Sequence, residues 1–149
     1  MLRNTTVLFL LLSCSQPAIE ARTAPTEISS IYWSDGDSGR ITKTDGTVIK
    51  FRLDDWDAPE AGGRGAAIGG AKCELERERG FESKAFMVEN TRKGASYVAR
   101  SEYDGYERLL FDILVDGADI APLAEAHGHL KSWRHDGKKS LEPRPNWCD

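Results

Sequence analysis

The sequence predicts a small, mainly β domain of the α+β class, in which short strands form a barrel with helical additions. The length of 149 residues suits one ordinary domain. Five Asp-Gly pairs, which favour tight turns, divide the chain into short segments. A hydrophobic fraction of 40% with 9% aromatic residues supplies a core and excludes a disordered chain.

The first 21 residues are typical of an export signal. Arg3 precedes an apolar run over 7–12, which is much shorter than the ~20 residues needed to span a bilayer. Cleavage after Ala21 predicts a secreted or periplasmic protein. Lipidation of Cys14 instead predicts a lipoprotein anchored to a membrane, and a cytosolic protein with an apolar tail is the third alternative.

The cysteines agree with export. Cleavage after Ala21 removes Cys14 and leaves Cys73 and Cys148. An even pair in an oxidising compartment predicts one disulfide between the middle of the domain and the end of the chain. Two free buried thiols are the alternative.

The strands follow a polar linker at residues 22–29, and the folded domain is predicted over 30–149. The clearest hairpin turn is Asp45-Gly46, because it lies between two short segments rich in β-branched residues. The predicted strands are 41–44, 47–51, 95–100 and 108–115.

A first helix is predicted over residues 79–93, followed by Gly94 as the stop. Its apolar side chains at helical spacing, which are expected to face the core, are Phe81, Ala85 and Val88. Before this helix, the segment 62–70 holds five glycines and predicts a loop.

A second helix is predicted to begin after Asp119, whose side chain suits an N-cap, and to end at Gly128. The side chains expected along its inner face are Ile120, Leu123, Ala124 and His127.

One segment concentrates residues that suit phosphate and metal chemistry. Arg52 and Asp57 are five positions apart, so they lie on opposite faces of a straight strand and converge only if the chain bends. Pro59 marks the end of strand pairing and places Asp57 and Glu60 on a rigid corner. Carboxylates and carbonyls held at such a corner suit a hard cation such as calcium.

The net charge limits the kind of nucleic-acid contact that is expected. The chain has a net charge of −4, which argues against a sequence-independent coat on nucleic acid but allows one small basic pocket.

Three motifs occur in a fixed order: Asp-Gly-Asp-Ser at 35–38, Phe-Arg-Leu-x-x-x-Asp-Ala-Pro-Glu at 51–60 and Tyr-x-Arg-x-Leu at 106–110. With them, residues 30–133 resemble the thermonuclease family, the staphylococcal-nuclease-like proteins. The tail at 146–148, Asn-Trp-Cys, is similar to that of secreted members. The resemblance implies a five-stranded OB-fold barrel with about three helices, and calcium-dependent cleavage of DNA and/or RNA that leaves a 3′-phosphate.

The resemblance also implies a role for each matched residue. The implied calcium ligands are Asp37, Asp57 and the Ala58 carbonyl. Glu60 would either position or deprotonate the attacking water. The implied phosphate clamp is Arg52 and Arg108, with Tyr106 near the nucleotide. The three implied carboxylates carry −3 against +2 from the two arginines, so the set is −1 without metal. One Ca²⁺ makes it +1, which suits charge developing on phosphate oxygens. Outside the motifs, Trp133 is either a stacking platform for a base or a rim aromatic.

Some residues depart from the family pattern. Asp54, Asp55 and Glu107 add carboxylates beside the predicted clamp, so we expect weaker attraction of phosphate. A non-catalytic OB-fold module that binds nucleic acid is therefore the first alternative, and an envelope-associated protein anchored through Cys14 is the second. No organic cofactor is expected, a monomer is the default, and the preference between DNA and RNA stays open.

Overall fold

The computed structural model of the protein describes residues 24–62, 70–136 and 139–149. The export signal predicted at 1–21, with Cys14, lies outside the described residues. So do residues 63–69, which form most of the predicted glycine-rich loop.

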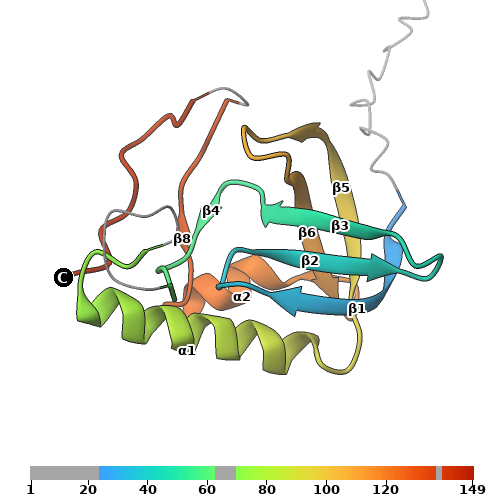
Figure 1. The fold of residues 1–149 in the computed structure, drawn as a ribbon, viewed down its shortest axis with the longest axis horizontal. Helices are drawn as coiled ribbons and strands as arrows, with labels where there is room; N and C mark the ends of the chain where they lie inside the picture. Colours follow the sequence, from blue (N-terminus) through green and yellow to red (C-terminus); the bar gives the residue numbers. More distant parts are fainter. Residues whose placement is uncertain (1–23, 63–69, 137–138) are drawn as a thin grey trace, which may run out of the picture.

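Five strands close into a barrel (Figure 1). They are β1 (Thr26–Trp33), β2 (Ser38–Lys43), β3 (Val48–Leu53), β5 (Ser96–Tyr103) and β6 (Leu109–Val115). Antiparallel pairing gives the order β3-β2-β1-β5-β6, and parallel pairing of β3 with β6 closes the ring. This confirms the predicted α+β class and is consistent with an OB-fold barrel.

Short strands and two helices complete the described chain. They are β4 (Trp56–Asp57), α1 (Glu74–Thr91), β7 (Ala118–Asp119), α2 (Ile120–Ala126) and β8 (Lys131–Ser132). Two helices occur in the described residues, where about three were predicted. β4 pairs with β8 in a separate two-stranded sheet. None of the described helices is long and apolar enough to cross a membrane.

The hairpin prediction is confirmed. β2 and β3 pair across Asp45-Gly46, Gly46 has a φ of +84°, and Asp45 accepts a hydrogen bond from the Thr47 N–H at 2.9 Å. The predicted linker is too long, because β1 begins at Thr26 and its first residues pair with β5.

Aromatic rings fill the barrel. Phe51 packs edge-on against Trp33 at 5.1 Å and stacks on Phe111 at 5.5 Å between ring centroids. The Trp33 indole donates to Thr91 Oγ1 at 3.1 Å, so its polar group is satisfied where it is buried. β3, which carries Phe51, is therefore held on its inner side by close packing.

The predicted inner face of the first helix is wrong. α1 begins at Glu74, and Phe81 and Val88 are 52% and 47% exposed, with Ala85 also exposed. The buried residues are Glu76, Gly80, Ser83, Met87 and Thr91.

The reason is the close approach of α1 to the corner after β4. A Cβ on Gly80 would lie 2.6 Å from the carbonyl carbon of Glu60, so only glycine fits there. Ser83 donates to the His129 carbonyl at 2.8 Å on the same side of the helix. The small residues Gly80 and Ser83 let α1 touch the backbone that carries Glu60, and Phe81 and Val88 lie on the exposed side of the helix.

The second helix begins as predicted. Asp119 is the N-cap of α2 and accepts from the Ala121 N–H at 3.0 Å. Ile120 and Ala124 are buried, but Leu123 and His127 are exposed, so only part of the predicted inner face is correct.

The predicted disulfide is present. Cys73 and Cys148 are bonded, with their Cα atoms 6.1 Å apart. Cys73 is also the N-cap of α1, since its sulfur accepts from the Glu76 N–H at 3.3 Å. The end of the chain is therefore fixed to the start of α1.

Candidate functional site

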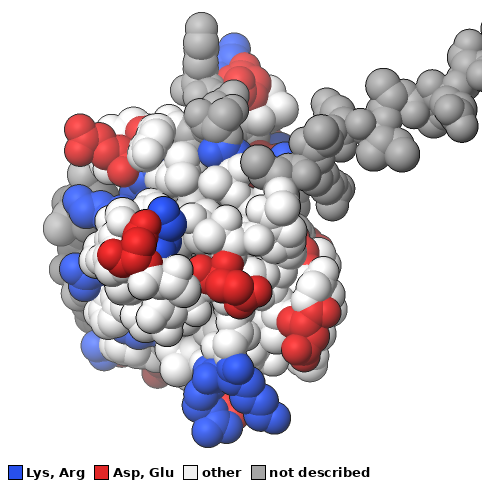
Figure 2. Space-filling model, turned by 90° about the vertical axis from the view of Figure 1, so that its right-hand side faces the viewer, with Lys and Arg blue, Asp and Glu red and all other residues white. Residues whose placement is uncertain are grey.

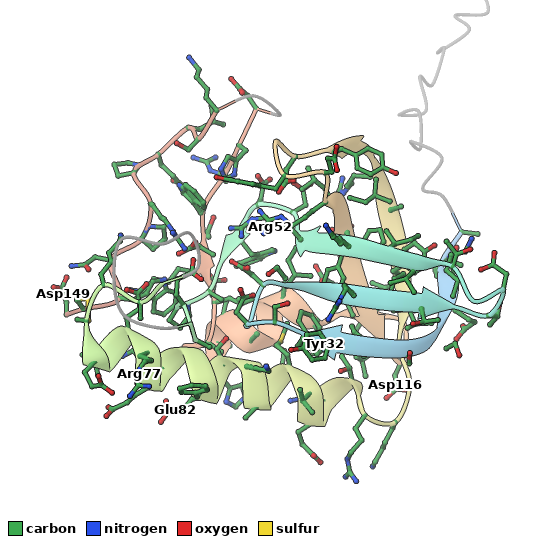
Figure 3. The ribbon with its side chains drawn as sticks, viewed as in Figure 1. Tyr32, Arg52, Arg77, Glu82, Asp116 and Asp149 are labelled. Carbon is green, nitrogen blue, oxygen red and sulfur yellow. A yellow bond between two sulfur atoms is a disulfide. The ribbon has the colours of Figure 1, made fainter. Side chains whose placement is uncertain are left out.

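A cluster of carboxylates and arginines lies where β3 turns into β4, around the labelled Arg52 in Figure 3. We name it the carboxylate–arginine cluster. Its members are Asp37, Arg52, Asp57, Glu60 and Arg144, joined by hydrogen bonds and ion pairs.

The bend predicted between Arg52 and Asp57 is observed. Asp55 has a φ of +61°, in the left-handed region, and reverses the chain between β3 and β4. Arg52 then donates from Nη2 to the Trp56 carbonyl at 2.9 Å and lies 3.6 Å from Asp57 Oδ1. The turn therefore brings together two residues that a straight strand would separate.

Asp37 joins the cluster from the turn before β2. Its Oδ1 accepts from Arg52 Nη1 at 3.1 Å, and its Oδ2 accepts from the Ala58 N–H at 2.8 Å. Its exposed fraction is 3%. One arginine thus holds two buried carboxylates, Asp37 and Asp57, on either side of its guanidinium.

Arg144 completes the cluster, and the sequence analysis missed it. It donates from Nε to Asp57 Oδ1 at 2.8 Å and from Nη2 to Glu60 Oε1 at 2.7 Å. The other oxygen of Asp57 accepts from Trp147 Nε1 at 2.8 Å. Both residues belong to the C-terminal segment, whose only sequence signal was the Asn-Trp-Cys tail.

Several contacts attach the C-terminal segment. Arg79 of α1 donates to the Trp147 carbonyl at 2.9 Å, and Lys131 of β8 donates to the Asn146 carbonyl at 2.6 Å. The disulfide at Cys148 adds a covalent link. Arg144 is therefore presented to the cluster by a segment that is fixed on two elements.

Trp133 lies beside the cluster. Its ring centroid is 5.7 Å from Arg52 Cζ and 5.5 Å from Arg144 Cζ, within cation–π range. Its indole donates to the Glu142 carbonyl at 3.1 Å, and its backbone N–H donates to the Asp55 carbonyl at 2.8 Å. Trp133 therefore forms one wall of the site.

The structure does not bring Arg108 and Tyr106 into the cluster. Arg108 donates from Nε to Asp104 Oδ2 at 2.7 Å, and Tyr106 is 60% exposed with Arg108 Cζ 5.3 Å from its ring centroid. Among the described residues, no side-chain hydrogen bond, ion pair or ring contact links either of them to Arg52. Arg108 is therefore paired with Asp104, and its role as a phosphate clamp stays a prediction.

Two of the three acidic residues that were expected to weaken phosphate attraction have structural partners. Asp55 accepts from the His135 N–H at 2.8 Å, and Asp54 lies 3.5 Å from Arg100 Nε. Glu107 has a φ of +59° and is exposed in the β5–β6 turn. Asp54 and Asp55 therefore help to hold the outer side of the β3–β4 turn.

The carboxylate of Asp35 is hydrogen-bonded to the backbone of Asp37. Its Oδ1 accepts from the Asp37 N–H at 3.1 Å, the Ser38 N–H at 2.8 Å and Ser38 Oγ at 2.9 Å. Burial raises the pKa of Asp35 to about 7, the charges of Asp37 and Glu60 add to the rise, and the Ser38 hydrogen bond opposes it. Burial also raises the pKa of Asp57, against the hydrogen bond from Trp147.

The pKa of Asp35 predicts how stability changes with pH. Folding raises this pKa from 3.8 to about 7, so the folded state holds a proton that the unfolded state releases. This contribution is fully present below pH 4 and is lost as the pH rises through 7. In EDTA, the free energy of unfolding of Asp35→Asn should fall less between pH 5 and 8 than that of the wild type, as measured by urea titration. Parallel curves for the two proteins would show that Asp35 does not titrate in this range.

Gly36 allows the Asp35–Asp37 turn to pack closely against α1. A Cβ there would overlap Ser83 of α1 and would lie 2.9 Å from Ala58 Cβ. We expect Gly36→Ala to cost about 1–3 kcal/mol of unfolding free energy through overpacking. Gly105→Ala is the matched control, because nothing lies within 4 Å of that Cβ and it should be nearly neutral. Equal melting temperatures for the two variants would contradict this packing.

The donor set suits a hard cation. Asp35, Asp37, Asp57 and Glu60 offer carboxylate oxygens only, the ligands that calcium prefers. The positive charges nearest to them are the guanidinium groups of Arg52 and Arg144. Among the described residues, a metal-spaced group of His, Cys, Asp or Glu is found only at Cys73, Glu76 and Cys148, where the disulfide occupies both sulfurs.

No protein-family model matches the chain, and no curated protein matches it. Its function is therefore inferred from the residues and geometry of the site.

Proposed function

We propose that the protein is an exported, calcium-dependent nuclease that hydrolyses phosphodiester bonds of DNA and/or RNA. The observation that carries the proposal is the bend between β3 and β4, which places Arg52 between the buried carboxylates of Asp37 and Asp57. Glu60 lies three residues further on, at the same corner. An arginine fork, hard oxygen ligands and a separate carboxylate are the groups that metal-assisted phosphate hydrolysis requires.

Arg52 is positioned to bind the phosphate. Its side chain is 14% exposed, and its Nη1 and Nη2 atoms are held by Asp37 and the Trp56 carbonyl. A guanidinium fixed in this way stabilises charge on phosphate oxygens without having to reorganise. A calcium ion held by Asp37, Asp57 and the Ala58 carbonyl would supply further positive charge to the same oxygens.

Glu60 is proposed to act on the attacking water. Its carboxylate is bound by Arg144 through Oε1 and is 18% exposed, so it is oriented and still reached by solvent. It either positions the water or takes its proton while the water oxygen bonds to phosphorus. The bond to the 5′ oxygen breaks, that oxygen gains a proton, and the products are a 3′-phosphate and a 5′-hydroxyl.

The charge of the site supports metal dependence. Four carboxylates and two arginines lie together, which gives −2, or −1 when Asp35 is protonated. The carboxylates are Asp35, Asp37, Asp57 and Glu60, and the arginines are Arg52 and Arg144. A negative site repels a phosphodiester, and a divalent cation removes that repulsion.

The ion dependence of cleavage tests the proposal. Oxidised protein is mixed with labelled single-stranded DNA in Ca²⁺, in Mg²⁺ and in EDTA, and the product ends are identified. We expect cleavage in Ca²⁺ alone, with 3′-phosphate ends. Absence of cleavage in all three conditions would refute the nuclease.

One observation favours a second function, a non-catalytic module that binds nucleic acid. Arg144 already bridges Asp57 and Glu60, so the cluster can serve as a structural network of ion pairs. A module of this kind binds oligonucleotides but cleaves none, and Arg144→Gln does not make it active. In a nuclease, Arg144→Gln should instead tighten calcium binding, which calorimetry measures directly.

Export is part of the proposal. The intact mass of the exported protein tests whether the signal is cleaved after Ala21 or the protein is lipidated at Cys14. A chain that starts at Arg22 supports a secreted or periplasmic protein. A lipidated Cys14 supports the envelope-anchored alternative.

A further inference from the structure

The outer face of β1, β2 and β3 carries basic side chains and no carboxylate along the rows of residues that pair across these strands. Ile41 and Phe51 point into the core and are fully buried, so their neighbours in each strand point outward. The outward residues of these rows are Ser30, Tyr32, Arg40, Thr42, Val48, Lys50 and Arg52. None of them is acidic, although the whole chain has a net charge of −4.

Strand register places the cations in order. Tyr32 lies opposite Arg40, and Arg40 lies opposite Lys50. Arg52 follows Lys50 by two residues and therefore lies on the same face, about 7 Å further along β3. In Figure 3 the labelled Tyr32 and Arg52 both lie on the side of these strands that faces the viewer.

α1 adds a further cation, Lys84, to this face. Lys84 Nζ lies 5.2 Å from the centroid of the Tyr32 ring, and Arg40 Cζ lies 5.0 Å from it. A ring face attracts cations but does not neutralise them. We name Arg40, Lys50 and Lys84 the cationic row.

The cationic row is not neutralised by carboxylates. No ion pair between described residues includes Arg40, Lys50 or Lys84. At the neighbouring end of the barrel, by contrast, Figure 2 shows acidic and basic side chains interspersed. The row thus leaves three positive charges available to an anionic partner.

We propose that the cationic row binds the phosphate backbone of a single-stranded polynucleotide whose reacting phosphate lies at Arg52. The inference deepens the proposed function and rests on it for the position of that phosphate. Several cations on one face suit a polymer with one negative charge per nucleotide. Hydroxyl groups such as that of Thr42 offer further donors to phosphate oxygens.

The shape of the site favours a single strand over a duplex. Arg52 is only 14% exposed and lies at a buried corner, while Arg40 and Lys50 are exposed on an open sheet. A flexible strand can follow the sheet and then turn one phosphate toward the corner. A stiff duplex cannot make that turn without being deformed.

Binding in EDTA tests the proposal without cleavage. The probes are fluorescent thymidine oligomers, a dimer and an octamer, followed by anisotropy over a series of salt concentrations. The row variant carries Arg40→Gln, Lys50→Gln and Lys84→Gln. The control variant loses the same charge elsewhere through Arg92→Gln, Lys93→Gln and Arg134→Gln.

We expect the wild type and the control to bind the octamer more tightly than the dimer, because the octamer reaches the cationic row. The row variant should bind the octamer at least tenfold more weakly at low salt. The slope of log affinity against log salt should become shallower by roughly 2, because three phosphate contacts are lost.

Some outcomes overturn the proposal. Equal octamer affinity and salt slope for the row and control variants would do so, as would absence of octamer binding by the wild type. Binding to anionic phospholipid vesicles that depends on the row, without binding to the octamer, would assign it to a membrane instead. A wild type that binds through the row but never cleaves in Ca²⁺ would keep this inference and refute the nuclease.

Discussion

Replacement of Glu60 by Gln is expected to lower the turnover of single-stranded DNA by roughly 10²- to 10⁴-fold. Gln keeps the size of the side chain and retains an oxygen for Arg144, but it cannot take a proton from water. The bond between Arg144 Nη2 and Glu60 Oε1, at 2.7 Å, orients the carboxylate, and the amide oxygen can accept the same bond. The defect should therefore lie in the chemical step.

The measurement is single-turnover cleavage at saturating Ca²⁺, with calcium-dependent binding of a nucleotide as the second readout. Binding should be retained in Glu60→Gln, and circular dichroism should show a folded protein. Glu125→Gln is the control, because it removes one exposed carboxylate on α2, outside the predicted site, and should cleave like the wild type. Normal turnover in Glu60→Gln would remove Glu60 from the mechanism.

Loss of the Cys73–Cys148 disulfide is expected to cost about 4 kcal/mol of unfolding free energy in the chain-entropy model. The bond joins residues that are 75 positions apart, so its removal frees a long loop in the unfolded chain. Cys73→Ser is the more informative variant, because serine is itself a good N-cap and can replace the sulfur that accepts from Glu76. Its loss of stability should therefore report the disulfide rather than the cap.

Thermal unfolding with and without reductant measures the effect. Cys73→Ser and Cys148→Ser should melt at similar temperatures, and reductant should lower the melting temperature of the wild type but not of either variant. A wild type that is as insensitive to reductant as the variants would contradict the disulfide. Since Cys148 follows Trp147, whose indole is bonded to Asp57, the reduced protein should also bind calcium with altered affinity.

Local sequence signals were sufficient to predict those features in which a residue contacts its near neighbours in the chain. Asp45-Gly46 makes the β2–β3 turn and Asp119 caps α2, because each turn or cap involves residues only two or three positions away. Strand geometry also predicted that Arg52 and Asp57 can converge only if the chain bends between them, and the structure brings them within 3.6 Å. The bend itself is made by Asp55 in a left-handed conformation.

The face of α1 was not predictable from helical periodicity. Periodicity places Phe81 and Val88 inward, but the contact of Gly80 with the backbone of Glu60 turns another face toward the barrel. That contact depends on a corner twenty residues earlier in the chain, and no local pattern encodes it. Arg108 is a different case, because its ion pair with Asp104 is local, four positions away, and competes with the predicted phosphate site.

The amino-acid sequence alone was enough to specify the class of barrel, its hairpin, the disulfide partners and the residues of the β3–β4 corner, because these depend on short-range patterns and on counting. The folded chain was needed to bring Arg144 and Trp147 to Asp57, since they lie 87 and 90 positions away. It was also needed to align Tyr32, Arg40 and Lys50 across three strands. Contacts between distant segments form only when the barrel closes and packs, so their physical cause lies in the tertiary structure.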